Sequence, residues 1–171
     1  MDAQGAARYV DMGVLDLRKV NDGYEKLRII FDKVTALCEL HSPDCLAIES
    51  PFYGRNAQVI FKLGRAQGAA MVAAVSKGLE VYEYAPRKAK MAICGNGAAS
   101  KEQVALIVER TLGINIEARY LDATDALAIA MCHYYQITSP LSGGADCKPA
   151  GSGRKSGSWA GFIAEHPDRV K

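Results

Sequence analysis

The chain has 171 residues, enough for one domain with a substantial core, and its hydrophobic fraction of 49% and charged fraction of 23% are ordinary for a globular protein. It contains no run of 18 apolar residues, and its first residues lack the basic and apolar segments of a signal peptide, so we expect no membrane span and a cytoplasmic location. Five cysteines without CxxC spacing favour reduced, mostly buried thiols over disulfides or a zinc site.

The net charge of +2 hides an uneven distribution. Residues 54–101 carry eight basic and two acidic side chains, a net +6, which leaves −4 for the remainder. Such asymmetry indicates a polyanionic partner, although ordinary solvated helix faces explain it equally well.

The N-terminal part of the chain predicts a strand, a helix and a second strand. Residues 8–17 alternate between apolar and polar side chains and are interpreted as a strand. A turn at residues 20–23 starts an amphipathic helix that ends before His41. Residues 45–50 form a short apolar run, which predicts a buried central strand that Pro51 terminates. This order of elements indicates an α/β protein.

Glu49 is the single carboxylate at the C-terminal end of that apolar strand. Open α/β sheets bind their ligands at the carboxyl ends of strands, so Glu49 is a candidate site residue. A strand-end glutamate in a surface salt bridge is the alternative.

The middle of the chain predicts a long helix over residues 57–77, rich in Gly and Ala, with Gly78 at the C′ position. Its small residues indicate either tight packing on the protein's own sheet or a helix–helix contact in a dimer. Residues 79–84 predict the next strand, and Pro86 suits the first position of a short basic helix.

Two more helices follow. Ser100 and Gln103 match a capping box, and the helix that they begin stops at Gly113. A last, mainly apolar helix starts near Leu121. Beyond Gln136 the composition turns rich in Gly and Ser, so we predict a domain at residues 1–137 and a flexible linker with a short C-terminal tail at residues 138–171.

Asp122 and Asp125 lie three residues apart in the first turn of the last helix and therefore on one face of it. Two acids among apolar residues repel each other unless a cation lies between them. Together with Glu49 they provide three oxygen ligands, which suits Mg²⁺ or Mn²⁺ and not zinc. Carboxylate-held metals commonly promote attack of water on a phosphodiester. The alternative is that both aspartates only cap the helix N-terminus.

Six motifs stand out along the chain: AIESPF (47–52), Arg55-Asn56, KLGRAQG (62–68), YAPRKAK (84–90), GNGAASK (95–101) and DATDALAIA (122–130). In this order and roughly this spacing, they resemble the core of the RuvC-type Holliday-junction resolvases. The resemblance spans about residues 9–135. It implies an RNase H-like α/β fold with a mixed sheet flanked by helices, a homodimer, and symmetric nicking of four-way DNA junctions that depends on Mg²⁺, about two ions per site, with Mn²⁺ as a substitute. It also implies the junction-binding and helicase motor proteins of the branch-migration complex as partners.

The resemblance also assigns roles to residues. Glu49, Asp122 and Asp125 match three of the family's four catalytic, metal-binding acids. Lys90 and Lys101 match basic residues near the scissile phosphate and the DNA backbone. We count the remaining DNA-binding candidates within the same motifs: Phe52, which matches an aromatic at the junction centre, and Arg55, Asn56, Arg87 and Lys88.

One feature departs from the family pattern. The family opens with a strand that ends in an Ile-Asp-Pro-Gly motif, and that Asp is the fourth acid; Asp2 lacks this context. We therefore expect an N-terminally incomplete sheet with unpaired strand edges. Two alternatives follow: a catalytically impaired junction-binding or scaffold protein of the same fold, and an RNase H-like nuclease that acts on RNA–DNA hybrids.

Overall fold

The computed structural model describes residues 6–50, 56–117 and 121–138, without the side chains of Leu121 and Asp122. These residues form five helices and two strands. In chain order they are α1 (Gly23–His41), β1 (Cys45–Glu49), α2 (Ala57–Ser76), β2 (Glu80–Tyr84), α3 (Pro86–Cys94), α4 (Lys101–Leu112) and α5 (Leu121–Thr138).

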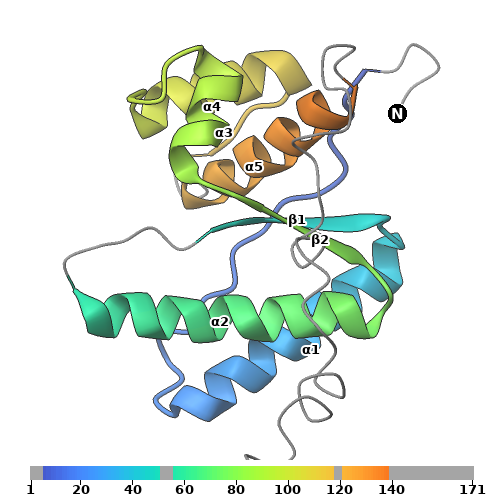
Figure 1. Ribbon diagram of the computed structural model, residues 1–171, viewed down its shortest axis with the longest axis vertical. Coiled ribbons are helices and arrows are strands. Elements are labelled where there is room, and N and C mark those ends of the chain that lie inside the picture. The colour runs from blue at the N-terminus through green and yellow to red at the C-terminus, as the bar shows by residue number, and fades with distance from the viewer. Residues whose placement is uncertain (1–5, 51–55, 118–120, 139–171) are drawn as a thin grey trace, which may run out of the picture.

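The two strands separate two layers of helices (Figure 1). β1 and β2 are parallel and pair in register from Cys45 beside Glu80 to Glu49 beside Tyr84. Helix α2 makes the crossover between them and packs with α1 on one side, while α3, α4 and α5 pack together on the other (Figure 1). Because the strands are parallel, the C-terminal ends of both lie at the same edge, beside the start of α3.

Most of the buried core lies in the layer of α3, α4 and α5. One cluster includes Val104 and Val108 of α4 against Met131 of α5. A second joins Tyr84, at the end of β2, to Ile129 of α5. Helix α1, in contrast, has no fully buried residue. The C-terminal ends of the strands are therefore held against the better-packed half of the molecule.

Local sequence signals for helix ends are confirmed. Ser100 and Gln103 form both hydrogen bonds of a capping box at the start of α4. Pro86 occupies the first turn of α3. Gly78 follows α2 with φ +80°, and Gly113 ends α4 with φ +66°, a backbone conformation that glycine adopts at no steric cost.

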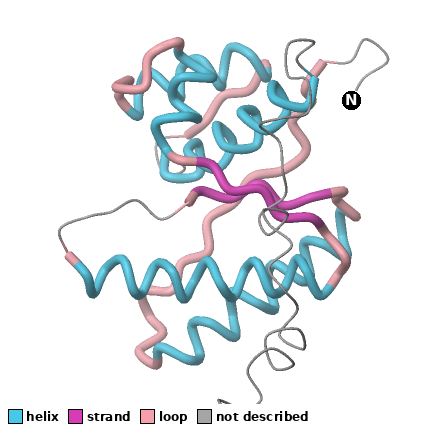
Figure 2. Tube along the Cα trace, viewed as in Figure 1, coloured by secondary structure: helices cyan, strands magenta, loops and turns pink. Residues whose placement is uncertain are grey.

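The predicted strand over residues 8–17 is wrong. The chain there is an irregular segment that runs between the two helix layers (Figure 2). Val10 and Val14 are exposed, while Met12 packs against the core of α4 and α5. A strand needs a hydrogen-bonded neighbour, and among the described residues β1 and β2 pair only with each other. Alternation in the sequence alone could not supply that partner.

β1 is also less buried than predicted. Residues 45–48 are half-buried and Glu49 is exposed, because only one edge of β1 is paired within the described part of the chain. Nearly all of the predicted linker and tail at residues 138–171 lies outside the described residues, so that division of the chain remains a prediction. In the regions that the structure describes, no helix combines the length and apolar character that crossing a membrane requires.

Candidate active site

Four of the predicted site residues line one small hollow at the C-terminal end of β1. Glu49 comes from β1, Lys90 from α3, and Lys101 and Asp125 from the starts of α4 and α5. The hollow has a volume of about 170 Å³, and its apolar wall includes Ala89 and Ile129. Residues that are as much as 76 positions apart in the sequence therefore face one space, as the hypothesis of a shared site requires.

The peptide group between Glu49 and Ser50 is hydrogen-bonded through both its N–H and its C=O. The Ser50 N–H donates to the Tyr84 carbonyl at 2.8 Å, which ties the end of β1 to β2. The side-chain amide of Gln67, a buried residue of α2, donates to the Glu49 carbonyl. The backbone is thus fixed from two elements, while the carboxylate reaches the hollow.

Asp125 and Lys101 form an ion pair across the hollow. The distance from Lys101 Nζ to Asp125 Oδ2 is 3.1 Å, and both side chains are partly exposed. A pair so open to solvent contributes little to stability, about 1 kcal/mol or less. The pair matters for the site because it brings a cation and a carboxylate to the same wall of the hollow.

Lys90 is half-buried and is oriented by the loop between α3 and α4. Its Nζ donates to the Ala99 carbonyl at 2.8 Å. Gly97 in that loop packs directly on Arg87, since a Cβ atom there would lie 2.6 Å from Arg87 Cγ. The glycine-rich loop therefore fixes Lys90 and packs closely against Arg87.

Two carboxylates and two ammonium groups share the hollow. The pKa of Glu49 is raised, first by partial burial of its carboxyl group and then by the negative charge of Asp125, while Lys101 and Lys90 oppose the shift. Two carboxylates that repel each other would both be stabilised by a bound cation. The donors are oxygens, the ligand type that Mg²⁺ prefers, so these residues fit that ion.

Asp122, the third predicted acid, lies in the first turn of α5, and its side chain is outside what the structure describes. Within the described side chains, no group of three or more His, Cys, Asp or Glu residues is arranged to hold a metal. The proposed three-acid set therefore stays a prediction at Asp122.

The remaining DNA-binding candidates lie near this end of the molecule or outside the described residues. Asn56 caps α2, its side-chain oxygen accepting from the Gln58 and Val59 N–H groups at 3.1 and 3.3 Å. Arg87 and Lys88 are exposed on α3, and Lys88 Nζ lies 5.6 Å from the centre of the Tyr84 ring. The predictions at Phe52 and Arg55 fall outside the described residues.

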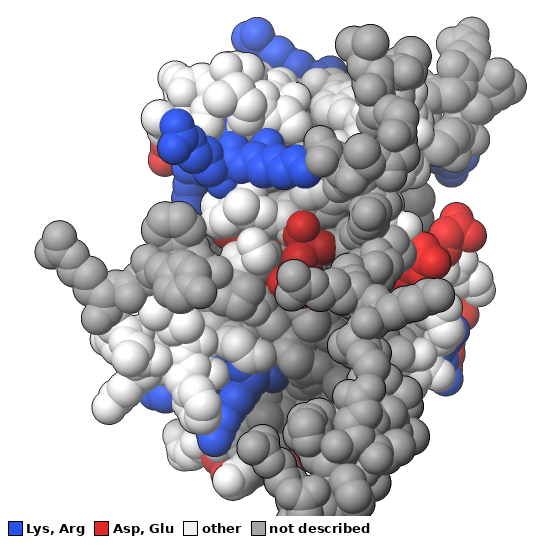
Figure 3. All heavy atoms as spheres, viewed as in Figure 1, with Lys and Arg blue, Asp and Glu red and all other residues white. Residues whose placement is uncertain are grey.

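Charge on the visible surface follows the same arrangement. Lys and Arg side chains lie over the helix layer above the strands and again over the lower layer, and acidic side chains are exposed between them (Figure 3). The juxtaposition of a basic surface with a small acidic centre suits a substrate with a phosphate backbone and a reaction at one phosphate.

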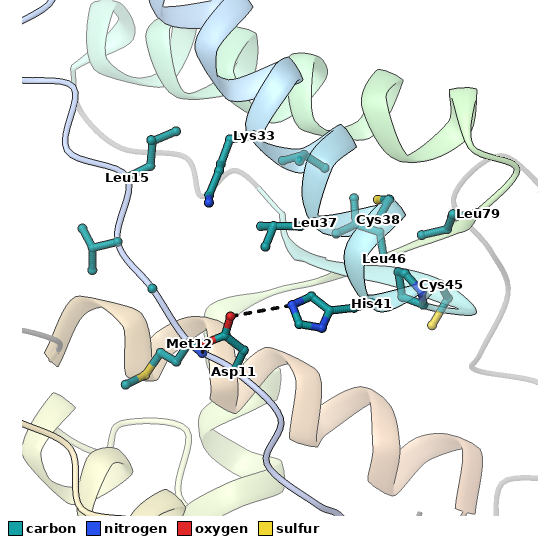
Figure 4. A pocket seen from close by; sticks show the side chains of 14 residues that line it. Asp11, Met12, Leu15, Lys33, Leu37, Cys38, His41, Cys45, Leu46 and Leu79 are labelled. Carbon is teal, nitrogen blue, oxygen red and sulfur yellow. Dashed lines mark hydrogen bonds and ion pairs between the residues drawn. The ribbon is translucent and has the colours of Figure 1, made fainter.

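A larger cavity lies elsewhere in the described residues. It measures about 640 Å³ and lies between residues 11–15, α1 and the start of β1 (Figure 4). Its wall is mainly apolar, and Asp11 pairs with His41 across it at 3.6 Å. It lacks the convergent carboxylates and lysines of the smaller hollow, which is therefore the candidate active site.

Sequence reasoning missed the residues that hydrogen-bond to the strands and so support the site. Besides Gln67, the buried His133 of α5 lies 2.7 Å from the Tyr84 hydroxyl and 3.2 Å from Cys45 Sγ. These contacts join residues 18 to 88 positions apart. Gln67 lies in the KLGRAQG motif, but the sequence assigned it no role, and His133 was marked only as a polar residue on an otherwise apolar helix face.

Comparison with known proteins gives a consistent result. The sequence model of one family, described as crossover junction endodeoxyribonuclease RuvC, matches residues 2–133. A RuvC of that description from Bacteroides fragilis is 48% identical over 95% of this chain and 82% of its own length. One from Porphyromonas gingivalis is 45% identical over 96% of this chain and 84% of its own.

Solved structures agree with these relatives. The Thermus thermophilus RuvC structure matches with a TM-score of 0.71 and 33% identity, over 85% of this chain and 84% of that one. The same protein in complex with a Holliday junction substrate matches with a TM-score of 0.75, over 85% and 86%. The class of protein is therefore an RNase H-like α/β nuclease. Within that class, the chain belongs to the RuvC family of crossover junction endodeoxyribonucleases.

Proposed function

We propose that this protein resolves four-way DNA junctions by Mg²⁺-dependent nicking of two symmetric strands, in recombination and repair. The family membership supports the reaction, and one observation supports the site: Glu49, Asp125, Lys90 and Lys101 face one hollow at the end of β1. Glu49, Asp125 and Asp122 would hold Mg²⁺, with Mn²⁺ as a substitute and two ions in each site. When bound, Mg²⁺ supplies the charge that activates water and stabilises the leaving 3′-oxygen.

The residues of this chain supply the remaining steps. Glu49 and Asp125 must be ionised to hold the metal, so the raised pKa of Glu49 predicts loss of activity in mild acid before a carboxyl group of ordinary pKa would titrate. Lys90 and Lys101 would offset the negative charge that develops on the scissile phosphate. Phe52, Arg55, Asn56, Arg87 and Lys88 would contact the DNA around it.

Symmetric cleavage requires two equivalent sites, which a two-fold homodimer provides. Helix α2 carries exposed apolar residues, including Phe61, Val72 and Val75, that favour a protein contact over solvent. A homodimer, a helicase motor complex as further partner and a cytoplasmic location belong to this proposal.

Asp125→Asn tests the reaction. Asparagine keeps the size of the side chain and removes the charge, so we expect the rate of junction nicking in Mg²⁺ to fall at least about 100-fold. Junction affinity, measured by gel shift in Ca²⁺ or without metal, should change little. Glu117→Gln, at an exposed acid that does not line the hollow, is the control.

The outcomes separate the alternatives. If the unmutated protein binds the junction in a gel shift but never nicks it, the protein is a binding or scaffold member of the family. A parent that prefers an RNA–DNA hybrid to a four-way junction would support the hybrid nuclease. Loss of binding together with cleavage in Asp125→Asn would assign that aspartate to the fold.

A further inference from the structure

The peptide group between Glu49 and Ser50 reveals which way the Glu49 carbonyl points. The Ser50 N–H is directed at β2, where it donates to the Tyr84 carbonyl at 2.8 Å. The chain has no cis peptide bond in its described part, and in a trans peptide the N–H and C=O point in opposite directions. The Glu49 carbonyl therefore points away from β2, toward the other edge of β1.

That edge has no strand beside it in the described residues, so its backbone groups need other partners. Gln67 meets this need at Glu49. Its side chain comes from α2, is only 9% exposed, and donates its Nε2 amide hydrogen to the Glu49 carbonyl. A side-chain amide of α2 thus serves as the partner of this carbonyl.

Gln67 is an unusual choice for its position. The other fully buried residues of α2 are Ala73 and Ala74, and the helix is otherwise mainly apolar. Burial of an amide costs free energy unless it is hydrogen-bonded, so a glutamine at this place is favoured only if its bond to Glu49 forms. The contact joins the helix layer of α1 and α2 to the one strand residue that faces the hollow.

We propose that Gln67 is a positioning residue for the active site, which fixes the end of β1 and hence the direction of the Glu49 carboxylate. This inference rests on the proposed function. Gln67 does not touch the hollow; it acts through the Glu49 backbone. Groups that orient metal-holding carboxylates in this way typically affect metal affinity or activity by about 10- to 100-fold when removed.

The first experiment measures metal dependence of junction nicking under single-turnover conditions. Gln67→Met keeps the length of the side chain and removes the donor. We expect the Mg²⁺ concentration for half-maximal rate to rise by about 10-fold, with junction affinity in Ca²⁺ unchanged. A merely structural role would lower the fraction of active protein without moving that midpoint. Gln58→Leu, an exposed glutamine of the same helix, is the control.

The second experiment does not need activity. In ¹³C,¹⁵N-labelled protein the Glu49 carbonyl resonance should move in Gln67→Met and stay in place in Gln58→Leu, and Mg²⁺ should shift the resonances around the hollow at a higher concentration in Gln67→Met. If the variant does not fold, Gln67→Leu, an uncharged side chain that also lacks the amide donor, replaces it in both measurements.

Each result decides a separate point. A parent chain that fails to nick junctions overturns the proposed reaction and leaves the resonance and Mg²⁺ titrations to judge Gln67. An unmoved Glu49 carbonyl resonance, or an unchanged Mg²⁺ midpoint in both Gln67 variants, overturns the positioning role.

Discussion

At the scale of single residues, Glu49 places function and stability in conflict. Burial and the charge of Asp125 raise its pKa, so the folded state favours the protonated form more than the unfolded state does. A folded-state pKa above the unfolded value adds stability at pH below about 4.5, and this contribution is lost as the pH rises through the folded-state pKa. At neutral pH and without metal, the ionised Glu49 therefore lowers the free energy of unfolding.

Glu49→Gln should consequently stabilise the fold at pH 7 while it abolishes nicking. Glutamine resembles the protonated acid, so the gain over the parent should shrink as the pH is lowered to 4. Urea unfolding without metal at the two pH values measures this difference. Glu83→Gln on β2, an exposed residue, should show no such pattern. Equal stability of parent and Glu49→Gln at pH 7 would show that the hollow does not disfavour the charge.

At the scale of secondary-structure elements, what the sequence could predict depended on the range of the interactions. The helix starts at Ser100 and Pro86 were predictable because a cap or a proline acts within one turn. Residues 8–17 were not, because strand formation depends on a partner elsewhere in the chain. That Glu49 and Asp125 lie near each other could be anticipated from two local facts. Glu49 ends a strand, and Asp125 lies in a first helical turn, where the helix dipole stabilises negative charge.

The supports of the site could not be anticipated in this way. Gln67 and His133 each lie within an apolar helix pattern, and their hydrogen bonds depend on how layers pack. His133 joins three elements, since its ring nitrogens meet Tyr84 at the end of β2 and Cys45 at the start of β1. The ring also lies 4.4 Å from that of Tyr82, centre to centre.

This histidine predicts a pH-sensitive attachment of α5 to the sheet. Burial lowers the pKa of His133, so it stays neutral in the folded state where the unfolded chain would take up a proton, near pH 6.5. The stability is complete above about pH 6.5 and falls as the pH drops toward the folded-state pKa. The urea concentration at the unfolding midpoint of the parent should therefore decrease as the pH is lowered from 7.5 to 5.5.

His133→Gln should be less stable by roughly 1–3 kcal/mol at pH 7.5, because hydrogen bonds to buried groups are lost, and should lose less than the parent on acidification. His41→Gln, at the exposed end of α1, controls for histidine content. A variant with the same acid sensitivity as the parent would mean that another group controls the transition.

At the scale of the whole molecule, basic side chains are concentrated in one stretch of the chain. The basic excess of residues 54–101 includes Arg87 and Lys88 on α3 beside the hollow, while Lys77 lies at the other end of α2 and pairs with Glu39 at 2.6 Å. Binding to a DNA backbone releases counterions, so affinity falls steeply with salt in proportion to the number of phosphates contacted. If only total charge mattered, each of these cations would contribute equally to DNA binding. In the proposed interface, Arg87 and Lys88 contact the DNA and Lys77 does not.

Arg87→Ala should weaken junction binding about equally for all junction sequences and reduce the slope of log affinity against log salt by about 1. Lys88→Ala should behave in the same way, whereas Lys77→Ala removes the same charge from the same basic segment and should leave the slope unchanged. Gel shifts from 50 to 200 mM salt, in Ca²⁺ so that cleavage does not intervene, provide the measurement. Equal slopes for the three variants would place the DNA on another face, and a reduced slope for Lys77→Ala alone would place it over the α1–α2 layer.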